Sequence, residues 1–153
     1  MRTYLTALLC TASILCLMAQ TSPARPGKYT SAAEIAQLLK KTPASANIGQ
    51  LVEIHPGMVL RHRMAGPNNA SVHSTETDKQ DVTEVYQIVD GGGTFVTGGM
   101  VADWKDRTRG ITGGEAHKVS RGDYIVIPAG TPHWFSSIDG SVTYLETRFP
   151  TKR

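Results

Sequence analysis

The sequence is poor in cysteine, and this shortage excludes several kinds of chemistry. Its 153 residues include two cysteines, Cys10 and Cys16, and both lie in the first twenty positions. That segment has a positive charge at Arg2, and residues 5–19 are apolar and uncharged. Such a run after a charged start is typical of a secretory signal peptide and is short for a membrane span. We therefore predict a mature chain without disulfides, thiol nucleophiles or cysteine metal ligands.

The predicted leader comprises residues 1–19, because Ala19 ends an acceptable cleavage site, and a cut after Ala24 is the alternative. A leucine precedes each cysteine, so a lipid anchor is not expected. The leader predicts that the protein is secreted, into the periplasm, and that it has no membrane contact once the leader is removed.

The sequence also lacks a strong excess of charge and is poor in aromatic residues. The formal net charge is +3, and aromatic residues make up 7% of the chain. Two small basic groups do not alternate with aromatic residues, so we expect solvated charges and no nucleic-acid partner. No glycine-rich loop opens a helix and no serine lies in a nucleophile elbow. The basic groups are Arg61 with Arg63, and Lys105, Arg107 and Arg109.

Residues 20–46 are predicted to be a linker followed by a single helix. Proline and glycine interrupt residues 21–29, which indicates a linker. Ser31 and Glu34 form a capping-box pattern, apolar residues recur at helical spacing after them, and Pro43 marks the end. We expect this helix to pack across one mouth or side of the following domain, or at a dimer seam.

The domain of residues 47–153 has the pattern of an all-β fold, an antiparallel jelly-roll barrel preceded by the one N-terminal helix. Residues 90–93 and 139–140 predict hairpin turns. Residues 100–114 break the strand pattern and predict a long connection. The predicted strands lie at residues 50–54, 59–64, 70–74, 83–89, 94–97, 116–119, 124–127, 133–138 and 142–149.

The segment from Gly122 to His133 is the most distinctive part of the sequence. A run rich in β-branched residues predicts a strand, and Pro128 ends it because proline cannot donate a ladder hydrogen bond. Gly130 permits a sharp bend. His133 is therefore expected at the start of a new strand, directed inward.

This segment closely resembles the second signature of the cupin family, through the spacing of Gly122, Pro128, Gly130 and His133. Upstream, Glu84 is followed after six residues by a glycine, which resembles the first cupin signature with its carboxylate ligand. The resemblance covers residues 47–149. It implies a cupin barrel, a metal centre and a homodimer.

The first signature is incomplete in this sequence. Cupins have two histidines, separated by one residue, shortly before the glutamate, and Asp78 and Gln80 occupy those positions here. The nearest histidine is His73, eleven residues before Glu84. The simplest interpretation is a loop insertion around residues 75–81, with His73 replacing one or both family histidines.

The implied ligand set for one divalent transition metal is His73, Glu84 and His133. Two imidazoles and a carboxylate suit a non-haem Fe(II) site with open positions, and the same set accepts Mn, Ni, Zn or Co. Asp78 or Gln80 would join the set if the loop folds inward. The alternatives are exposed or partly buried histidines and a salt-bridged glutamate.

The remaining histidines are weaker candidates. His62 alternates with Arg61 and Arg63, so it points inward if the arginines point outward, and it is then a reserve ligand. His55 lies beside a turn and His117 at a strand entry, so both are expected at the surface.

Three functional hypotheses remain open from the sequence. The first is a secreted, metal-binding cupin that, as an enzyme, is a metal-dependent dioxygenase-type oxidoreductase acting on a small organic molecule. The second is a metal-dependent isomerase, decarboxylase or lyase, with Tyr86 or His62 as catalytic base. The third is a non-catalytic module that binds a small ligand, which the departures at Asp78 and Gln80 favour.

Overall fold

The structure of this protein is a computed structural model that describes residues 27–44, 49–66, 71–76 and 81–151. The predicted leader, residues 1–19, lies outside the described residues. So do Asp78 and Gln80, the two positions at which the first signature departs from the cupin pattern.

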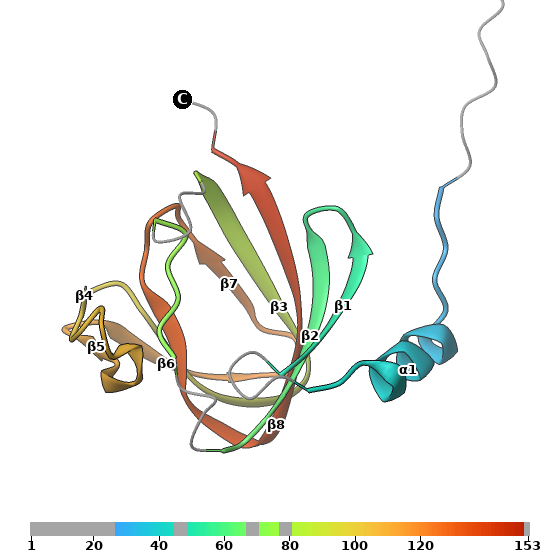
Figure 1. The fold of residues 1–153 in the computed structure, drawn as a ribbon, viewed down its shortest axis with the longest axis horizontal. Coiled ribbons are helices and arrows are strands. Elements are labelled where there is room, and N and C mark those ends of the chain that lie inside the picture. Colours follow the sequence, from blue (N-terminus) through green and yellow to red (C-terminus); the bar gives the residue numbers. More distant parts are fainter. Residues whose placement is uncertain (1–26, 45–48, 67–70, 77–80, 152–153) are drawn as a thin grey trace, which may run out of the picture.

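The predicted N-terminal helix is confirmed as α1, Ala32–Lys41. Its capping box is present, because the Ser31 backbone N–H donates to Glu34 Oε2 at 2.7 Å and the Glu34 backbone N–H donates to Ser31 Oγ at 3.2 Å. The Gln50 side-chain amide donates to the carbonyls of Leu39 and Thr42, both at 2.7 Å, and fixes the C-terminal end. The helix lies outside the barrel (Figure 1), and none of its residues is buried. Among the described residues, no helix has the length and apolar character needed to cross a membrane.

The barrel is an antiparallel sheet whose strands follow the order β1-β2-β8-β3-β6, with β7 also paired to β3. This architecture confirms the antiparallel jelly-roll type of barrel predicted from the strand pattern. A second, two-stranded sheet and one 3₁₀ helix, η1, lie in the predicted long connection. The strands are β1 Gln50–His55, β2 Met58–Met64, β3 Val82–Thr97, β4 Met100–Val101, β5 Ile111–Thr112, β6 Glu115–Ser120, β7 Tyr124–Ile127 and β8 His133–Pro150, and η1 is Arg107–Arg109.

The two predicted hairpin turns, at residues 90–93 and 139–140, are wrong. Both glycine-containing segments continue as strand, so β3 and β8 are each one long, bent strand that curls around the barrel (Figure 1). The pairing of β3 with β8 shifts register near Gly91 and Gly93, as at β-bulges. A Cβ at Gly93 would lie 2.2 Å from the Ser137 carbonyl oxygen. These glycines therefore allow neighbouring backbones to approach, where the sequence pattern indicated a chain reversal.

The predicted strand at residues 70–74 is also reduced in the structure. Its described part forms a single antiparallel bridge, His73 with His133. The following residues turn away at residues 75–76. This bridge lies at the candidate site and pairs two of the predicted ligands.

The barrel interior contains both aromatic and charged side chains. Phe95 and Phe135 meet edge to face with ring centroids 4.9 Å apart, and Tyr86 stacks on Tyr144 at 4.7 Å. Phe135 lies in the core, as alternation along the strand from the inward-directed His133 requires. The apolar core is Tyr86, Ile88, Phe95, Val119, Ile127, Phe135, Val142 and Tyr144, and buried charged or titratable residues near it include Glu84, His133 and Glu146.

Candidate metal centre

The two histidines of the site are brought together by their own backbones. The His73 N–H donates to the His133 carbonyl at 2.8 Å, and the His133 N–H donates to the His73 carbonyl at 2.9 Å. Residues in such a hydrogen-bonded antiparallel pair project their side chains to the same side. The imidazole centroids are accordingly 5.0 Å apart, with the rings at 83° to each other.

His133 is held in the tautomer that a metal ligand needs. Its Nδ1 lies 3.0 Å from the Thr131 carbonyl oxygen, which can only accept, so Nδ1 carries the proton and Nε2 the lone pair. The side chain is 2% exposed. Burial lowers the pKa of His133 to about 4, although Glu84 acts in the opposite direction. The imidazole is therefore neutral at neutral pH, and its Nε2 lies 3.3 Å from Glu84 Oε2.

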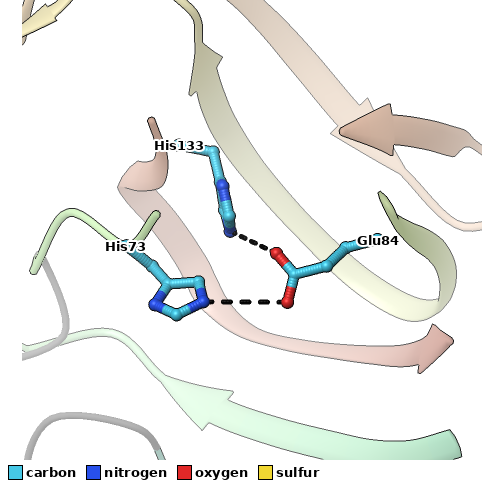
Figure 2. Close-up of side chains that lie close together, drawn as sticks. All are labelled: His73, Glu84 and His133. Atoms are coloured by element: carbon cyan, nitrogen blue, oxygen red, sulfur yellow. Dashed lines mark ion pairs between the residues drawn. The ribbon is translucent and has the colours of Figure 1, made fainter. Parts of the chain in front are cut away.

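Glu84 is the third member of the cluster and is completely buried. Its Oε2 lies 3.3 Å from His133 Nε2, and its Oε1 lies 3.7 Å from His73 Nε2 (Figure 2). Burial raises the pKa of Glu84, but hydrogen bonding from His73 and the positive charge of Arg148 act in the opposite direction, and the pKa is lowered overall, so the group is a carboxylate. Neither oxygen accepts a well-aligned hydrogen bond from the described residues. Arg148 Nη2 supplies one positive charge at 3.0 Å from Oε1, but among the described residues the buried Oε2 faces only an imidazole, so a further cation would stabilise the carboxylate.

The donor atoms fit one divalent ion. His73, Glu84 and His133 each offer one ligand atom, and these atoms lie within 4.8 Å of one another. Ligands at about 2.0–2.2 Å from a common ion are roughly 3.0–3.5 Å apart in octahedral or tetrahedral arrangements. The observed separations of 3.3 and 3.7 Å are close to this range. Because ligand type alone accommodates several transition metals, the set indicates a divalent metal without naming it.

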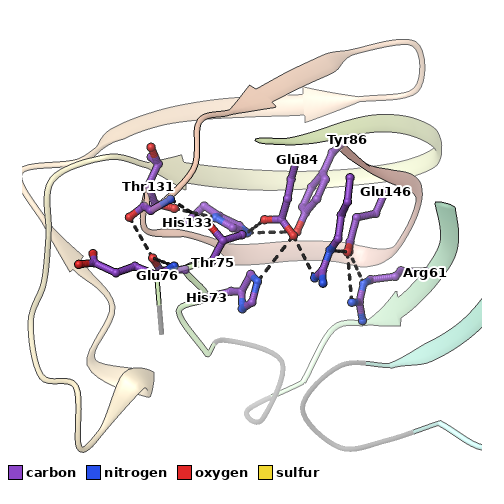
Figure 3. Close-up of polar contacts among 12 residues, drawn as sticks. Arg61, His73, Thr75, Glu76, Glu84, Tyr86, Thr131, His133 and Glu146 are labelled. Carbon is purple, nitrogen blue, oxygen red and sulfur yellow. Dashed lines mark hydrogen bonds and ion pairs between the residues drawn. The ribbon is translucent and has the colours of Figure 1, made fainter. Parts of the chain in front are cut away.

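A pair of buried hydroxyls fixes the segments that carry the two histidines. Ser74 Oγ donates to the Gly130 carbonyl at 2.9 Å, and the Gly130 N–H donates to Thr75 Oγ1 at 2.7 Å (Figure 3). The two side chains are 0% and 1% exposed. They join the residues after His73 to the bend before His133. Sequence reasoning missed them, because the local pattern indicated only a strand end at Ser74 and a polar loop from Thr75.

A second buried carboxylate, Glu146, lies beside the cluster in a row of charges (Figure 3). Arg61 Nε donates to its Oε2 at 2.5 Å, and Arg148 Nε donates to its Oε1 at 2.8 Å. Arg148 Nη2 also lies 3.0 Å from Glu84 Oε1. The pKa of Arg61 is raised, because the hydrogen bond and charge of Glu146 outweigh the effect of burial. The sequence signal was available: residues 144, 146 and 148 alternate onto the interior face.

Tyr86, a predicted catalytic residue, lies at the cluster. Its hydroxyl is 3.1 Å from His133 Nε2, which carries the lone pair, so the hydroxyl is the donor. Burial raises the pKa of Tyr86 well above its usual value, and the neighbouring Tyr144 and Glu146 add to the shift. Tyr86 therefore keeps its proton and is suited to donate a hydrogen bond.

His62 lies away from the cluster, contrary to its prediction as reserve ligand. Its Nδ1 is 2.8 Å from Thr143 Oγ1. The alternation argument was sound, but Arg61 and Arg63 point inward and line the pocket, so His62 takes the opposite face. Arg61 can lie largely inside the barrel because Glu146 supplies its counter-charge. The sequence pattern did not reveal this pairing. His55 and His117 are exposed, as predicted.

A pocket of about 330 Å³ opens beside the cluster. This size lies at the lower end of the range of about 300–1,000 Å³ typical of small-molecule sites. The walls combine aromatic rings with arginines. The lining residues are Leu51, Arg61, Arg63, Ser71, Val72, His73, Tyr86, Phe95, Arg107, His133, Trp134, Tyr144 and Arg148.

Among the comparisons with known proteins, only the search of solved structures finds similar proteins. A scan of family models finds no match to this sequence, and a search of curated proteins also finds none. A cupin protein from Bacteroides fragilis is 20% identical, with 72% of this chain and 83% of that chain covered and a TM-score of 0.46. The antiparallel barrel of this chain is established by its own strand pairing.

Two other solved structures are also similar to parts of this chain. Hydroxypropylphosphonic acid epoxidase from S. wedmorenis, in complex with fosfomycin, is 16% identical, with 61% of this chain and 44% of that chain covered and a TM-score of 0.42. This chain therefore matches less than half the length of that enzyme. CENP-C of Drosophila melanogaster, bound to CAL1, is 14% identical, with 76% and 95% covered and a TM-score of 0.47. At these identities the similarity concerns the fold alone, and function must be argued from the site.

Proposed function

We propose that this protein binds one divalent transition metal through His73, Glu84 and His133 and uses it to oxidise a small organic molecule. The observation that carries this proposal is the convergence of two imidazole nitrogens on a buried carboxylate that accepts no well-aligned hydrogen bond from the described residues. Three protein ligands leave coordination positions open. When bound, such a metal supplies adjacent sites for a substrate oxygen and for O₂.

The chain's own residues orient the ligands and restrict water. The Thr131 carbonyl holds the ring of His133 through Nδ1. The buried rings of Phe95 and Tyr144 form an apolar part of the pocket wall that His133 also lines. Metal binding requires the lone pair of His133 Nε2, so the Tyr86 hydroxyl must then find another acceptor. A substrate oxygen in the pocket is the acceptor we propose.

Oxidation is favoured over isomerase or lyase chemistry because the described pocket residues, the proposed ligands apart, include no suitable base. Isomerisation and elimination need a group to take a proton, whereas decarboxylation needs a proton donor and is separated from oxidation only by oxygen uptake. The raised pKa of Tyr86 keeps it protonated, and His62 lies on the other face of β2. Metal-dependent oxidation requires no such base from the protein.

Nitric oxide binding to the Fe(II)-loaded protein tests the proposal without knowledge of the substrate. Nitric oxide occupies the position that O₂ would take, and its complex with Fe(II) has a distinctive electron paramagnetic resonance signal. We expect one nitrosyl complex per chain in the wild type and none in Glu84→Gln. Stoichiometric Fe(II) binding without a nitrosyl complex would contradict an oxygen-accepting centre and favour a non-catalytic role.

Oxygen uptake then distinguishes the remaining chemistries. The Fe(II) protein is incubated with a panel of small organic molecules, and O₂ consumption is recorded together with product formation. Turnover with O₂ consumption supports oxidation. Turnover without it would instead support the isomerase or lyase alternative.

We also propose that residues 1–19 direct export and are removed. The support is the charged start and apolar run of that segment. The intact mass of the protein recovered from the periplasm should lack these residues. A full-length mass there would overturn the assignment.

A further inference from the structure

The charged side chains that line the pocket are all arginines. No Asp, Glu or Lys is among its lining residues in the described part of the chain. Two buried carboxylates, Glu84 and Glu146, contact this wall from the interior side. At this pocket wall, four guanidinium groups therefore stand against two carboxylates among the described residues. The arginines are Arg61, Arg63, Arg107 and Arg148.

Two of these arginines retain capacity to bind a further anion. Arg61 contacts Glu146 through Nε and Nη2, but a guanidinium has five N–H donors. Arg107 forms no ion pair with any described residue. Its backbone is fixed next to the site, because the Val72 N–H donates to the Arg107 carbonyl at 3.1 Å. This bond places η1 beside the segment that carries His73.

The other walls of the pocket are apolar and aromatic. Tyr86, Phe95 and Tyr144 present ring surface, and Leu51 and Val72 add aliphatic surface. Trp134 also lines the pocket. Its indole N–H is buried and has no hydrogen-bond partner among the residues the structure describes. A ligand that matches these walls has an apolar body as well as an acceptor group.

We propose that the pocket binds a small organic oxyanion, a carboxylate or a phosphate or phosphonate, with its charged group between Arg61 and Arg107 and its apolar body against the aromatic wall. Guanidinium groups bind planar carboxylates and phosphoryl oxygens through paired, charge-assisted hydrogen bonds. A neutral ligand would displace water from these arginines without supplying a counter-charge. This inference deepens the proposed function by naming the class of substrate. The inference depends on the proposed function in one respect, which is that the metal lies beside the same pocket.

Binding of matched aromatic probes to the metal-free protein tests the proposal. Benzoate and phenylphosphonate carry the anionic group, and benzamide is a neutral molecule of nearly the same shape as benzoate. Titration calorimetry gives their affinities, and Trp134 fluorescence in a Trp104→Phe background gives a second readout. Without metal in the sample, any preference for the anion reports the arginines alone. The relative affinities of benzoate and phenylphosphonate distinguish the two oxyanion classes.

Arg107→Gln is the test variant and Arg109→Gln is its matched control. Both arginines belong to η1, but Arg109 is 64% exposed, pairs with Asp103 and does not line the pocket. Loss of a charge-assisted contact of this kind corresponds to about tenfold in affinity. We expect Arg107→Gln to weaken benzoate or phenylphosphonate binding about tenfold, and Arg109→Gln to leave it unchanged. Benzamide binding should be weaker in the wild type and insensitive to both variants.

Each other result overturns the inference. Equal affinity for benzoate and benzamide would show that charge is not recognised, and anion affinity unchanged by Arg107→Gln would show that this arginine plays no part. Failure of all probes to bind would exclude this ligand class from the pocket. Because the titration contains no metal, these failures are distinct from failure of the metal to bind at His73, Glu84 and His133, which would overturn the proposed function alone.

Discussion

Glu84 and Glu146 are both buried in the same barrel interior, but their surroundings differ in kind. Glu146 is 1% exposed and accepts hydrogen bonds from Arg61 and Arg148. Glu84 is 0% exposed and lies against two imidazoles, with Arg148 near one oxygen. One carboxylate is neutralised by the protein. The other has Arg148 at 3.0 Å from Oε1 and no aligned hydrogen-bond donor on Oε2 among the described residues, so an added cation would complete its surroundings.

The two glutamates are neighbours on the inner face of one strand pair, so burial alone does not separate their roles. Glu84 lies opposite Arg148, and Tyr86 lies opposite Glu146, in the β3–β8 pairing. The two glutamates share Arg148 but differ in the other side chains that contact them. Arg61 completes the shell of Glu146, whereas neutral His133 faces Glu84. We infer that Glu146 stabilises and orients the arginine wall, and that Glu84 coordinates the metal.

The largest effect is expected from Glu84→Gln. This change removes the anionic ligand but keeps the shape, so the metal affinity should fall by more than the about 10–100-fold typical of losing an outer hydrogen-bond partner. The free energy of unfolding of the metal-free protein should stay within about 1 kcal/mol of the wild type, because a costly buried charge is removed along with its ion pairs. Metal titration calorimetry and urea denaturation measure the two quantities.

Glu115→Gln is the control for that variant. Glu115 is 76% exposed and pairs with an exposed histidine, His117, on β6. Neither metal affinity nor stability should change by more than about 0.5 kcal/mol. A Glu84→Gln protein that retains wild-type metal affinity would remove the distinction between the two buried glutamates.

Glu146→Gln should lower stability strongly and metal affinity only slightly, the reverse of Glu84→Gln. Arg61 loses its counter-charge and Arg148 keeps that of Glu84, and breaking a buried ion pair in this way costs about 3 kcal/mol of stability, at the lower end of the usual range because both arginines remain partly exposed. The metal affinity should fall by no more than about tenfold, since Glu146 is not a ligand. Urea denaturation of metal-free protein checks the first effect. Greater loss of metal in Glu146→Gln than in Glu84→Gln would invert the assignment.

Thr75→Val tests how far the site depends on the buried hydroxyls. The substitution keeps the volume but removes the acceptor of the Gly130 N–H. The bend before His133 then loses one of its links to the His73 segment, and the metal affinity should fall about tenfold. Thr112→Val, at an exposed position of β5, is the matched control. Equal metal affinities in the two variants would show that the link does not position the ligands.

Tyr86→Phe should produce the smallest effect, and with the opposite sign. In the metal-free state the Tyr86 hydroxyl donates to the lone pair of His133 Nε2, which metal binding must release. Removing a bond worth about 0.5–1.5 kcal/mol should raise the metal affinity by up to about tenfold. The metal-free protein should lose up to a similar amount of stability. A lower metal affinity in Tyr86→Phe would mean that the tyrosine supports the bound state.

Much of the fold follows from local sequence patterns, because their physical causes are local. The capping pair Ser31 and Glu34 begins the helix as predicted, and alternation places Phe135 in the core. The turn at residues 90–93 was wrong because glycine permits both a chain reversal and the close approach of adjacent strands. Only the neighbouring backbone decides between the two. The turn at residues 139–140 was wrong because β8 continues through it, with Gly140 at positive φ.

The candidate site was predictable in its ligands and not in their surroundings. The spacing around His133 and Glu84 directed attention to both residues, and the structure brings His73 to them. The inward direction of Arg61, and with it the exclusion of His62, depends on Glu146 eighty-five positions away in the sequence. No local pattern carries such a pairing. Buried charges of this kind are found by asking which opposite charge shares the same interior face.

The most direct test of the central claim is anomalous diffraction from crystals of the zinc-loaded protein. We predict one strong peak per chain, at about 2.0–2.2 Å from a nitrogen of His73, a nitrogen of His133 and an oxygen of Glu84. Glu146 should keep its arginine partners and contribute no ligand. A peak at any other position, or none at full zinc occupancy in solution, would contradict the account.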